Sequence, residues 1–164
     1  MNSRERILSA IKHQQPDRVP VDLGAHGSSG MSFVAYQNLL KHLKLDYLPT
    51  KVHDVVQQLA QPEMALLDLF GVDVLDVGRQ FNDTPGYWHN IELVKGHPAL
   101  YPHWFKPEQQ PNGSWLAPNS TGEFIGKMPS GATFFDQVIF PYIDQYPADF
   151  RYLGNDMSRA VWSG

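Results

Sequence analysis

Helical patterns and short β-branched runs alternate along the first half of the chain. Asn2 followed by Glu5 is a capping-box pair, and it predicts a helix from residue 2 to about residue 14. Pro16 disfavours helical geometry in the residue before it and therefore ends that helix. Residues 19–23 then place Val, Val and Leu at alternate positions before a glycine, which predicts a short strand.

The alternation continues to residue 78. Ser32 is a suitable N-cap for a second helix, and Pro62 with Glu63 predicts the start of a third helix that ends at Gly71. Residues 52–61 fit either element type. Residues 72–77 read Val-Asp-Val-Leu-Asp-Val between two glycines, as in a buried strand. Because strands that alternate with helices are typical of βα units on a parallel sheet, we predict an α/β fold.

The chain changes character at about residue 81, where aromatic, proline and glycine residues become frequent. The pair Asn112-Gly113 predicts a hairpin turn, and residues 91–94 and 123–127 predict short antiparallel strands. We therefore divide the chain into three parts. Residues 1–80 hold the N-terminal helix and first βα units, residues 81–130 form a β-hairpin insertion, and residues 131–164 are a tail.

Two parallel strands with their helices do not complete a stable sheet. A (β/α)₈ TIM barrel typically needs roughly 250 residues, whereas this chain has 164. The prediction is therefore the N-terminal portion of a TIM barrel with a β-hairpin insertion, an incomplete barrel. The alternative is a small, complete α+β domain.

The composition excludes several classes of function. The formal net charge is -4 and no block of Lys or Arg occurs, which argues against nucleic acid as a partner. Residues 1–15 carry charges and amides where a signal peptide is apolar, and no run is long enough to span a membrane, so we predict a cytoplasmic protein. The absence of cysteine excludes disulfides, thiol nucleophiles and cysteine-ligated zinc within the chain.

Three segments resemble the N-terminal part of the uroporphyrinogen decarboxylase superfamily. They are residues 3–11 (SRERILSAI), residues 16–24 (PDRVPVDLG) and residues 69–77 (LFGVDVLDV). The similarity is greatest to the branch that contains corrinoid-dependent methyltransferases and decarboxylase-like proteins. The resemblance covers about residues 3 to 80, and it implies a (β/α)₈ barrel about twice as long as this chain.

The resemblance also implies which residues separate the activities of the superfamily. Its decarboxylases hold substrate carboxylates with two arginines after the first strand, and Ala25 and Ser29 stand at the matching positions. Their catalytic aspartate matches Gln80. These differences argue against tetrapyrrole decarboxylation. They favour, for the complete protein, methyl transfer between a corrinoid protein and a thiol or another small acceptor.

The methyltransferase branch uses zinc held by a His-x-Cys pair and a later Cys, from a part of the barrel that does not match this chain. We therefore expect no cofactor and no metal within this segment, with zinc and a corrinoid carrier belonging to the full-length protein. The segment alone is expected to be inactive. Two alternatives stay open: a uroporphyrinogen decarboxylase, and a non-catalytic half-barrel or truncated product that pairs with a second chain, for instance as a homo-oligomer.

Candidate substrate-binding residues follow the two predicted strands. His26, Ser28 and Ser29 lie in the glycine-rich loop after the first strand, on the side where barrel active sites are built. Asp76 and Arg79 end and follow the second strand, and the arginine suits an anionic substrate. The alternatives are a solvated loop and a surface ion pair. No residue is assigned as catalytic.

Other charged and aromatic residues favour structural roles. Asp73 is expected to be structural, and Asp17 with Arg18 predicts a local ion pair that holds the first connection. His89, His97 and His103 lie in the aromatic region, but prolines interrupt their spacing and no carboxylate completes a ligand set, so no metal site is predicted. The aromatic residues themselves predict a small core or, alternatively, a lid or partner surface.

Overall fold

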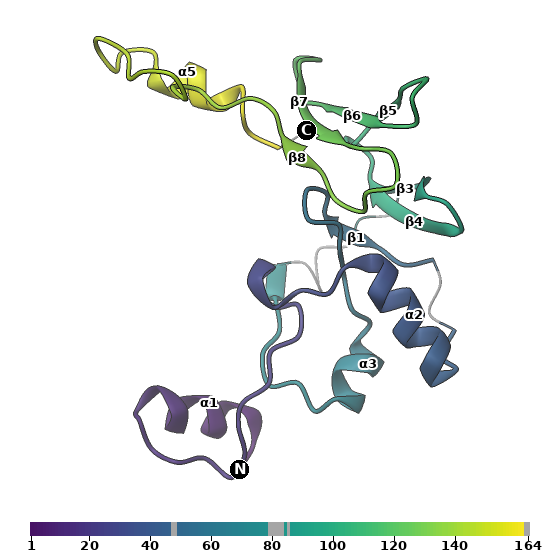
Figure 1. Cartoon of the computed structure of the whole chain (residues 1–164). Coiled ribbons are helices and arrows are strands. Elements are labelled where there is room, and N and C mark those ends of the chain that lie inside the picture. Colours follow the sequence, from purple (N-terminus) through teal and green to yellow (C-terminus); the bar gives the residue numbers. More distant parts are fainter. Residues whose placement is uncertain (47–48, 79–83, 85, 163–164) are drawn as a thin grey trace.

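The computed structural model describes residues 1–46, 49–78, 84 and 86–162 (Figure 1). Its helices are α1 (Ser3–Ile11), a 3-10 turn η1 (Gly27–Ser29), α2 (Phe33–Leu43), α3 (Met64–Leu69) and α5 (Leu153–Ser158). Its strands are β1 (Val52–Asp54), β2 (Leu59–Ala60), β3 (Trp88–Val94), β4 (His97–Pro102), β5 (Glu108–Gln109), β6 (Trp115–Pro118), β7 (Phe124–Met128) and β8 (Asp136–Gln137).

The described strands form three small antiparallel sheets. Two of them are the pairs β1–β2 and β3–β4, and the third has the order β5-β6-β7-β8. In the β3–β4 hairpin, His89 lies opposite Tyr101 and Ile91 lies opposite Ala99. A parallel bridge between Lys51 and Leu100 places the approach to β1 beside β4. Every strand ladder within the described residues is therefore local in sequence and antiparallel.

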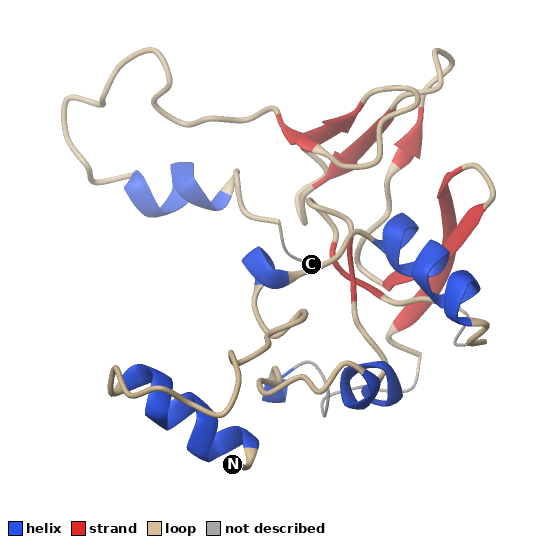
Figure 2. Cartoon of the chain, turned by 60° about the horizontal axis from the view of Figure 1, so that its bottom comes forward, coloured by secondary structure: helices blue, strands red, loops and turns tan. Residues whose placement is uncertain are grey.

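One hydrophobic core joins α2 to these sheets (Figure 2). Phe33 is fully buried and meets Tyr101 of β4 edge to face at 6.4 Å between ring centroids. Tyr101 in turn stacks on Phe105 at 5.4 Å, and Phe105 meets Phe135 at 5.7 Å. This aromatic chain connects the helix to the four-stranded sheet, so residues from both sides of position 80 share the core.

The three helices expected in the first half of the chain are confirmed. The Asn2 side chain accepts from the Glu5 N–H, and the Glu5 carboxylate accepts from the Asn2 N–H, which completes the expected capping box of α1. Ser32 caps α2 by accepting from the Ala35 N–H, and Glu63 is the N-cap of α3. A side-chain cap marks the start of α1 and of α2, whereas Glu63 makes no capping hydrogen bond at the start of α3.

The expected Asn112-Gly113 hairpin is also confirmed. Gln109 of β5 pairs with Trp115 of β6, so the turn falls between them. Gly113 has a φ of 79°, which a side chain would strain, and the Asn112 side chain accepts from the Ser114 N–H.

The expected α/β fold and the incomplete TIM barrel are wrong for the described residues. Residues 19–23 and 72–77 are not strands, and no parallel sheet joins them. The two segments do lie side by side, because the Asp73 N–H donates to the Val21 carbonyl. However, the Val21 N–H donates to the Asp73 side chain and Pro20 has no N–H, so a backbone ladder does not continue.

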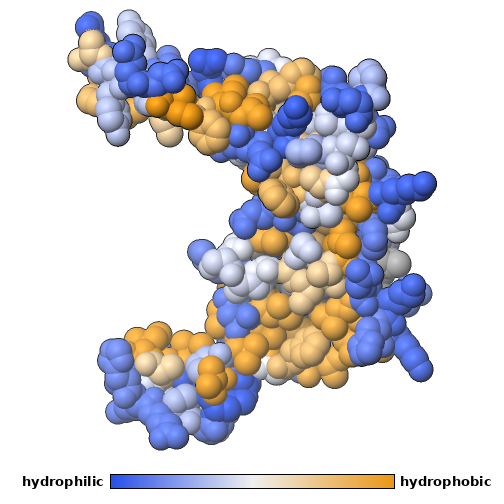
Figure 3. Space-filling view, viewed as in Figure 1, coloured by the Kyte–Doolittle hydropathy of each residue, from blue (hydrophilic) through white to orange (hydrophobic). Residues whose placement is uncertain are grey.

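Two arms extend from the body of the molecule (Figures 1 and 3). The N-terminal arm, residues 1–19, contains α1. The C-terminal arm, residues 138–161, leaves the four-stranded sheet after β8, contains α5 and returns to the body at Trp162. The space-filling view shows a hollow between the two arms.

Across the described part of the chain, no helix has both the length and the apolar character needed to cross a membrane.

Candidate functional site

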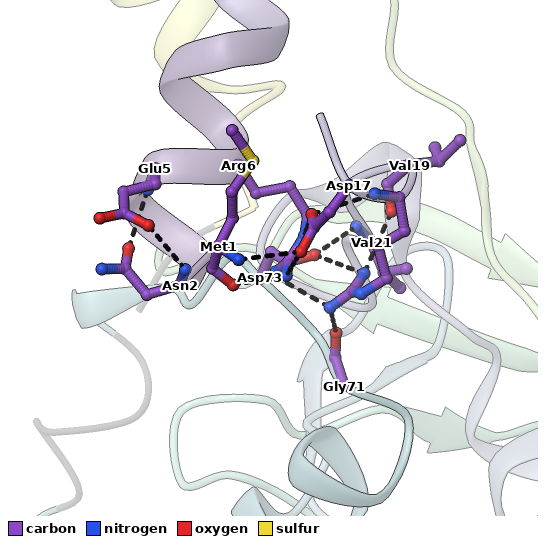
Figure 4. A network of polar contacts seen from close by, with 10 residues as sticks. Met1, Asn2, Glu5, Arg6, Asp17, Val19, Val21, Gly71 and Asp73 are labelled. Atoms are coloured by element: carbon purple, nitrogen blue, oxygen red, sulfur yellow. Dashed lines mark hydrogen bonds and ion pairs between the residues drawn. The ribbon is translucent and has the colours of Figure 1, made fainter. Parts of the chain in front are cut away.

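Four charged side chains from distant parts of the chain meet beside α1 (Figure 4). The guanidinium of Arg6 donates to Asp17 at 2.7 Å and also to Asp73. Arg18 donates to Asp73 at 2.8 Å and to the Gly71 carbonyl at 2.7 Å. We call these four residues, Arg6, Asp17, Arg18 and Asp73, the N-terminal ion-pair cluster.

The cluster replaces the local ion pair expected between Asp17 and Arg18. The Arg18 backbone N–H does donate to Asp17, but its guanidinium turns away to Asp73. The Asp73 side chain is fully buried and the Arg6 side chain is 8% exposed, whereas Asp17 and Arg18 remain 42% exposed. Asp73 therefore has the structural role expected for it, as the buried anion that two cations and a backbone N–H share.

The surroundings of the two carboxylates lower their pKa values. For Asp73, burial raises the pKa, but the Val21 N–H, the Ser3 hydroxyl and the two guanidiniums outweigh it and lower the pKa to about 2. For Asp17, hydrogen bonds from Arg6 and from the N-terminal amine lower the pKa well below its usual range. Both groups are ionised in the folded state throughout the neutral range.

These pKa values predict that acid releases α1. An unfolded Asp takes up its proton near pH 3.9, so the stabilisation from Asp73 is complete above about pH 4 and is lost as the pH falls toward 2. We expect the amide NMR signals of α1 to stay unchanged from pH 8 to 5 and to collapse between about pH 4 and 2. Loss of these signals between pH 7 and 5 would contradict this assignment.

The predicted loop residues His26, Ser28 and Ser29 bind mainly one another. The Ser28 N–H donates to His26 Nδ1 at 3.2 Å, and the Ser28 hydroxyl lies 2.9 Å from the same nitrogen. The Ser29 hydroxyl donates to the His26 carbonyl at 2.9 Å. These contacts cap the 3-10 turn η1, so the three side chains shape the loop.

A cavity of about 330 Å³ opens beside this loop. Gly27 forms one edge, β1 and the turn after it supply His53, Asp54, Val55 and Val56, and the indoles of Trp104 and Trp162 complete the wall. We call this cavity the indole pocket. It joins four segments that are far apart in sequence, and its size suits a small organic molecule.

The walls of the indole pocket are held firmly. Trp162 lies directly on Gly126, where any Cβ would overlap the indole ring, and its ring centroid is 5.9 Å from that of Phe135. The Asp54 carboxylate accepts from the N–H groups of Val56 and Gln57, both at 2.9 Å. Trp162 Nε1 is buried and makes no hydrogen bond to any described residue.

The remaining predicted residues do not join the pocket. Asp76 is half-buried and is not among the residues of the pocket wall. Arg79 and Gln80 lie outside the described residues.

The three histidines of the aromatic region do not converge. The rings of His89 and His103 lie 5.6 Å apart, and the His89 Nε2 contacts the Phe105 carbonyl at 2.9 Å. His97 lies elsewhere, with its Nδ1 2.8 Å from the Gln37 side-chain oxygen.

The described residues do not fit zinc or a corrinoid. They contain no cluster of three or more His, Cys, Asp or Glu side chains arranged to hold a metal ion. The larger cavity of about 460 Å³ at the end of α2 and the indole pocket are both of the size that holds small ligands. A corrin macrocycle with its side chains is much larger than such ligands.

Comparisons with protein-family models, with curated proteins and with solved structures find no match to this chain.

The sequence signals for the indole pocket were weak. His53 and Asp54 lie in residues 52–61, whose element type was ambiguous, and Trp104 belonged to an aromatic region with no regular spacing. Trp162 lies 58 positions after Trp104, so only the folded chain places both indoles at one cavity. The position of the glycine-rich loop was the one useful signal, because Gly27 does reach the pocket edge.

Proposed function

We propose that this chain takes part in corrinoid-dependent methyl transfer, within a protein similar to the methyltransferase branch of the uroporphyrinogen decarboxylase superfamily. The N-terminal ion-pair cluster is the observation that carries the proposal. Its members come from the three segments that bear the resemblance: Arg6 from residues 3–11, Asp17 and Arg18 from residues 16–24, and Asp73 from residues 69–77. Segments that share a motif for a structural reason are expected to meet in space, as these do.

The indole pocket supplies the part of this function that the chain itself carries, which is binding the small methylated substrate. Two tryptophans and Asp54 line the pocket. This combination suits an organic cation, since the negative face of an aromatic ring and a carboxylate both attract positive charge. A methylated ammonium compound of a few heavy atoms fits both this charge and a volume of about 330 Å³. Zinc and the corrinoid then belong to further polypeptide or to a partner protein.

Tetrapyrrole decarboxylation is less well supported by the same pocket. Its substrate carries several carboxylates, which arginines or lysines would hold. Among the described residues of the pocket wall none is Lys or Arg, and the loop beside it carries Ala25 and Ser29. The carboxylate of Asp54 would repel such a substrate.

The proposal predicts that tetramethylammonium binds in the indole pocket. We expect it to change the tryptophan fluorescence of the whole chain saturably. Replacing Trp104 with leucine should weaken this binding by roughly two- to thirtyfold, the effect expected when one cation–π contact is lost. Titration at constant ionic strength measures the dissociation constant.

Trp88→Leu is the matched control, because Trp88 belongs to β3 and not to the pocket wall. Its affinity for tetramethylammonium should equal that of the wild-type chain. An equal loss of affinity in both variants would contradict cation recognition. The same fluorescence response to neopentyl alcohol, which has a similar shape but no charge, would also contradict it. Release of carbon dioxide from a porphyrinogen would overturn the proposal in favour of decarboxylation.

A further inference from the structure

Both arms expose large apolar side chains to solvent. On the C-terminal arm, Ile143 is 73% exposed and Tyr146 is 82% exposed, and Phe140, Phe150 and Tyr152 are also exposed. On the N-terminal arm, Ile11 is 68% exposed and Val19 is 78% exposed. Figure 3 shows apolar areas on both arms. Large apolar side chains that are exposed together on one segment indicate an interaction surface.

The accessible surface of the chain is larger than that expected for a compact monomer of its mass. The accessible area is 10406 Å², whereas a folded monomer of 18.6 kDa is expected to expose about 8,200 Å². The excess is about 2,200 Å². Each subunit of an obligate dimer buries about 1,000–2,500 Å², so one partner of similar size accounts for the whole excess.

The two arms carry opposite charge. Residues 1–19 contain four cations, Arg4, Arg6, Lys12 and Arg18, against two anions, which leaves a net charge of +2. Residues 138–161 contain three aspartates against two arginines, which leaves a net charge of -1. Arg4 and Lys12 have no ion-pair partner among the described residues, and neither has Asp144.

The arms do not neutralise each other within one chain, because they extend from opposite ends of the body (Figures 1 and 2). A second copy of the chain offers each arm its complement. In a two-fold dimer, every contact occurs twice. If the N-terminal arm of the first copy packs on the C-terminal arm of the second, the N-terminal arm of the second copy packs on the C-terminal arm of the first.

We propose that this chain forms a two-fold homodimer in which the N-terminal arm of each copy packs on the C-terminal arm of the other. The exposed apolar side chains supply the buried core of this contact, and the opposite charges set its orientation. The same contact fixes the segment that leads back to Trp162, so dimerisation stabilises one wall of the indole pocket.

Charge exchange tests this dimer. In analytical ultracentrifugation, the wild-type protein should have twice the chain mass of 18.6 kDa. Arg4→Glu with Lys12→Glu makes both arms negative, and Asp144→Lys with Asp149→Lys makes both arms positive. Each double variant alone should dissociate at concentrations at least roughly tenfold higher than wild type, because like charges then face each other at both contacts.

The decisive result is the mixture of the two double variants. Every contact in the mixed dimer joins a negative arm to a positive arm, so an equimolar mixture should recover the dimer mass with one chain of each kind. Lys41→Glu with Lys95→Glu, on the exposed surface of the body, is the control and should remain dimeric. A monomeric wild-type chain, an open series of larger aggregates, or a mixture that stays monomeric would each overturn the proposal.

Discussion

Replacing Asp73 with asparagine is expected to release α1 from the body of the protein. Asparagine keeps the shape of the side chain but not its charge, so the nearly buried guanidinium of Arg6 loses one of its two anionic partners. Arg18 loses its ion pair at the same time. We expect hydrogen-exchange protection of the α1 amides to fall by roughly tenfold or more. The reason is that hydrogen bonds between ionised groups stabilise a fold more than hydrogen bonds between neutral groups.

Asp68→Asn provides the matched comparison for this substitution. Asp68 lies on the exposed side of α3, five positions before Asp73, and carries the same change of charge. In Asp68→Asn, hydrogen-exchange protection of the α1 amides should remain at the wild-type level. Should both variants lose protection equally, net charge rather than the N-terminal ion-pair cluster would be responsible. A retained α1 in Asp73→Asn would show that the cluster does not hold the helix.

Replacing Phe33 with alanine is expected to give the largest loss of stability from the core. Phe33 is fully buried at the start of α2 and contacts both Tyr101 and His97 edge to face. Truncating a buried phenylalanine removes its transfer free energy and leaves a cavity, at a cost of about 3–5 kcal/mol in the free energy of unfolding. Urea unfolding followed by tryptophan fluorescence measures this change.

Phe124→Ala is the matched control, because it makes the same truncation at a position that is not buried in the core. Phe124 is 37% exposed on β7, and its truncation should cost much less than that of Phe33. If both variants lost the same free energy, α2 would not be the element that joins the sheets. Phe33→Leu retains most of the apolar volume and should recover much of the loss.

The elements that sequence reasoning placed correctly have short-range causes. The capping box of Asn2 and Glu5, the Ser32 cap and the Asn112-Gly113 turn each depend on residues within four positions. A hydrogen bond between near neighbours forms in the same way whatever the rest of the chain does. These signals therefore predicted α1, α2 and the β5–β6 hairpin.

The strands predicted at residues 19–23 and 72–77 are wrong, because a strand depends on its partner, whereas those predicted at residues 91–94 and 123–127 are confirmed by β3 and β7. Residues 19–23 and 72–77 have strand-like composition, but a ladder needs a continuous row of backbone donors and acceptors on the neighbour. In the structure, the Asp73 carboxylate takes the Val21 N–H that a ladder would use. The ladders of the described residues form instead within residues 52–60 and within residues 88–137, between strands that follow one another along the chain.

For the candidate site too, the sequence predicts some features and only the tertiary structure decides the others. Position in the sequence directed attention to the loop around His26, and residue type directed it to Asp17, Arg18 and Asp73. The tertiary structure decided that the loop residues bind one another, that Arg6 completes the ion-pair cluster, and that Trp104 and Trp162 share a pocket. Helix caps and tight turns are local and can be derived from the sequence, whereas ion pairs and cavities between distant segments exist only after the core has brought those segments together.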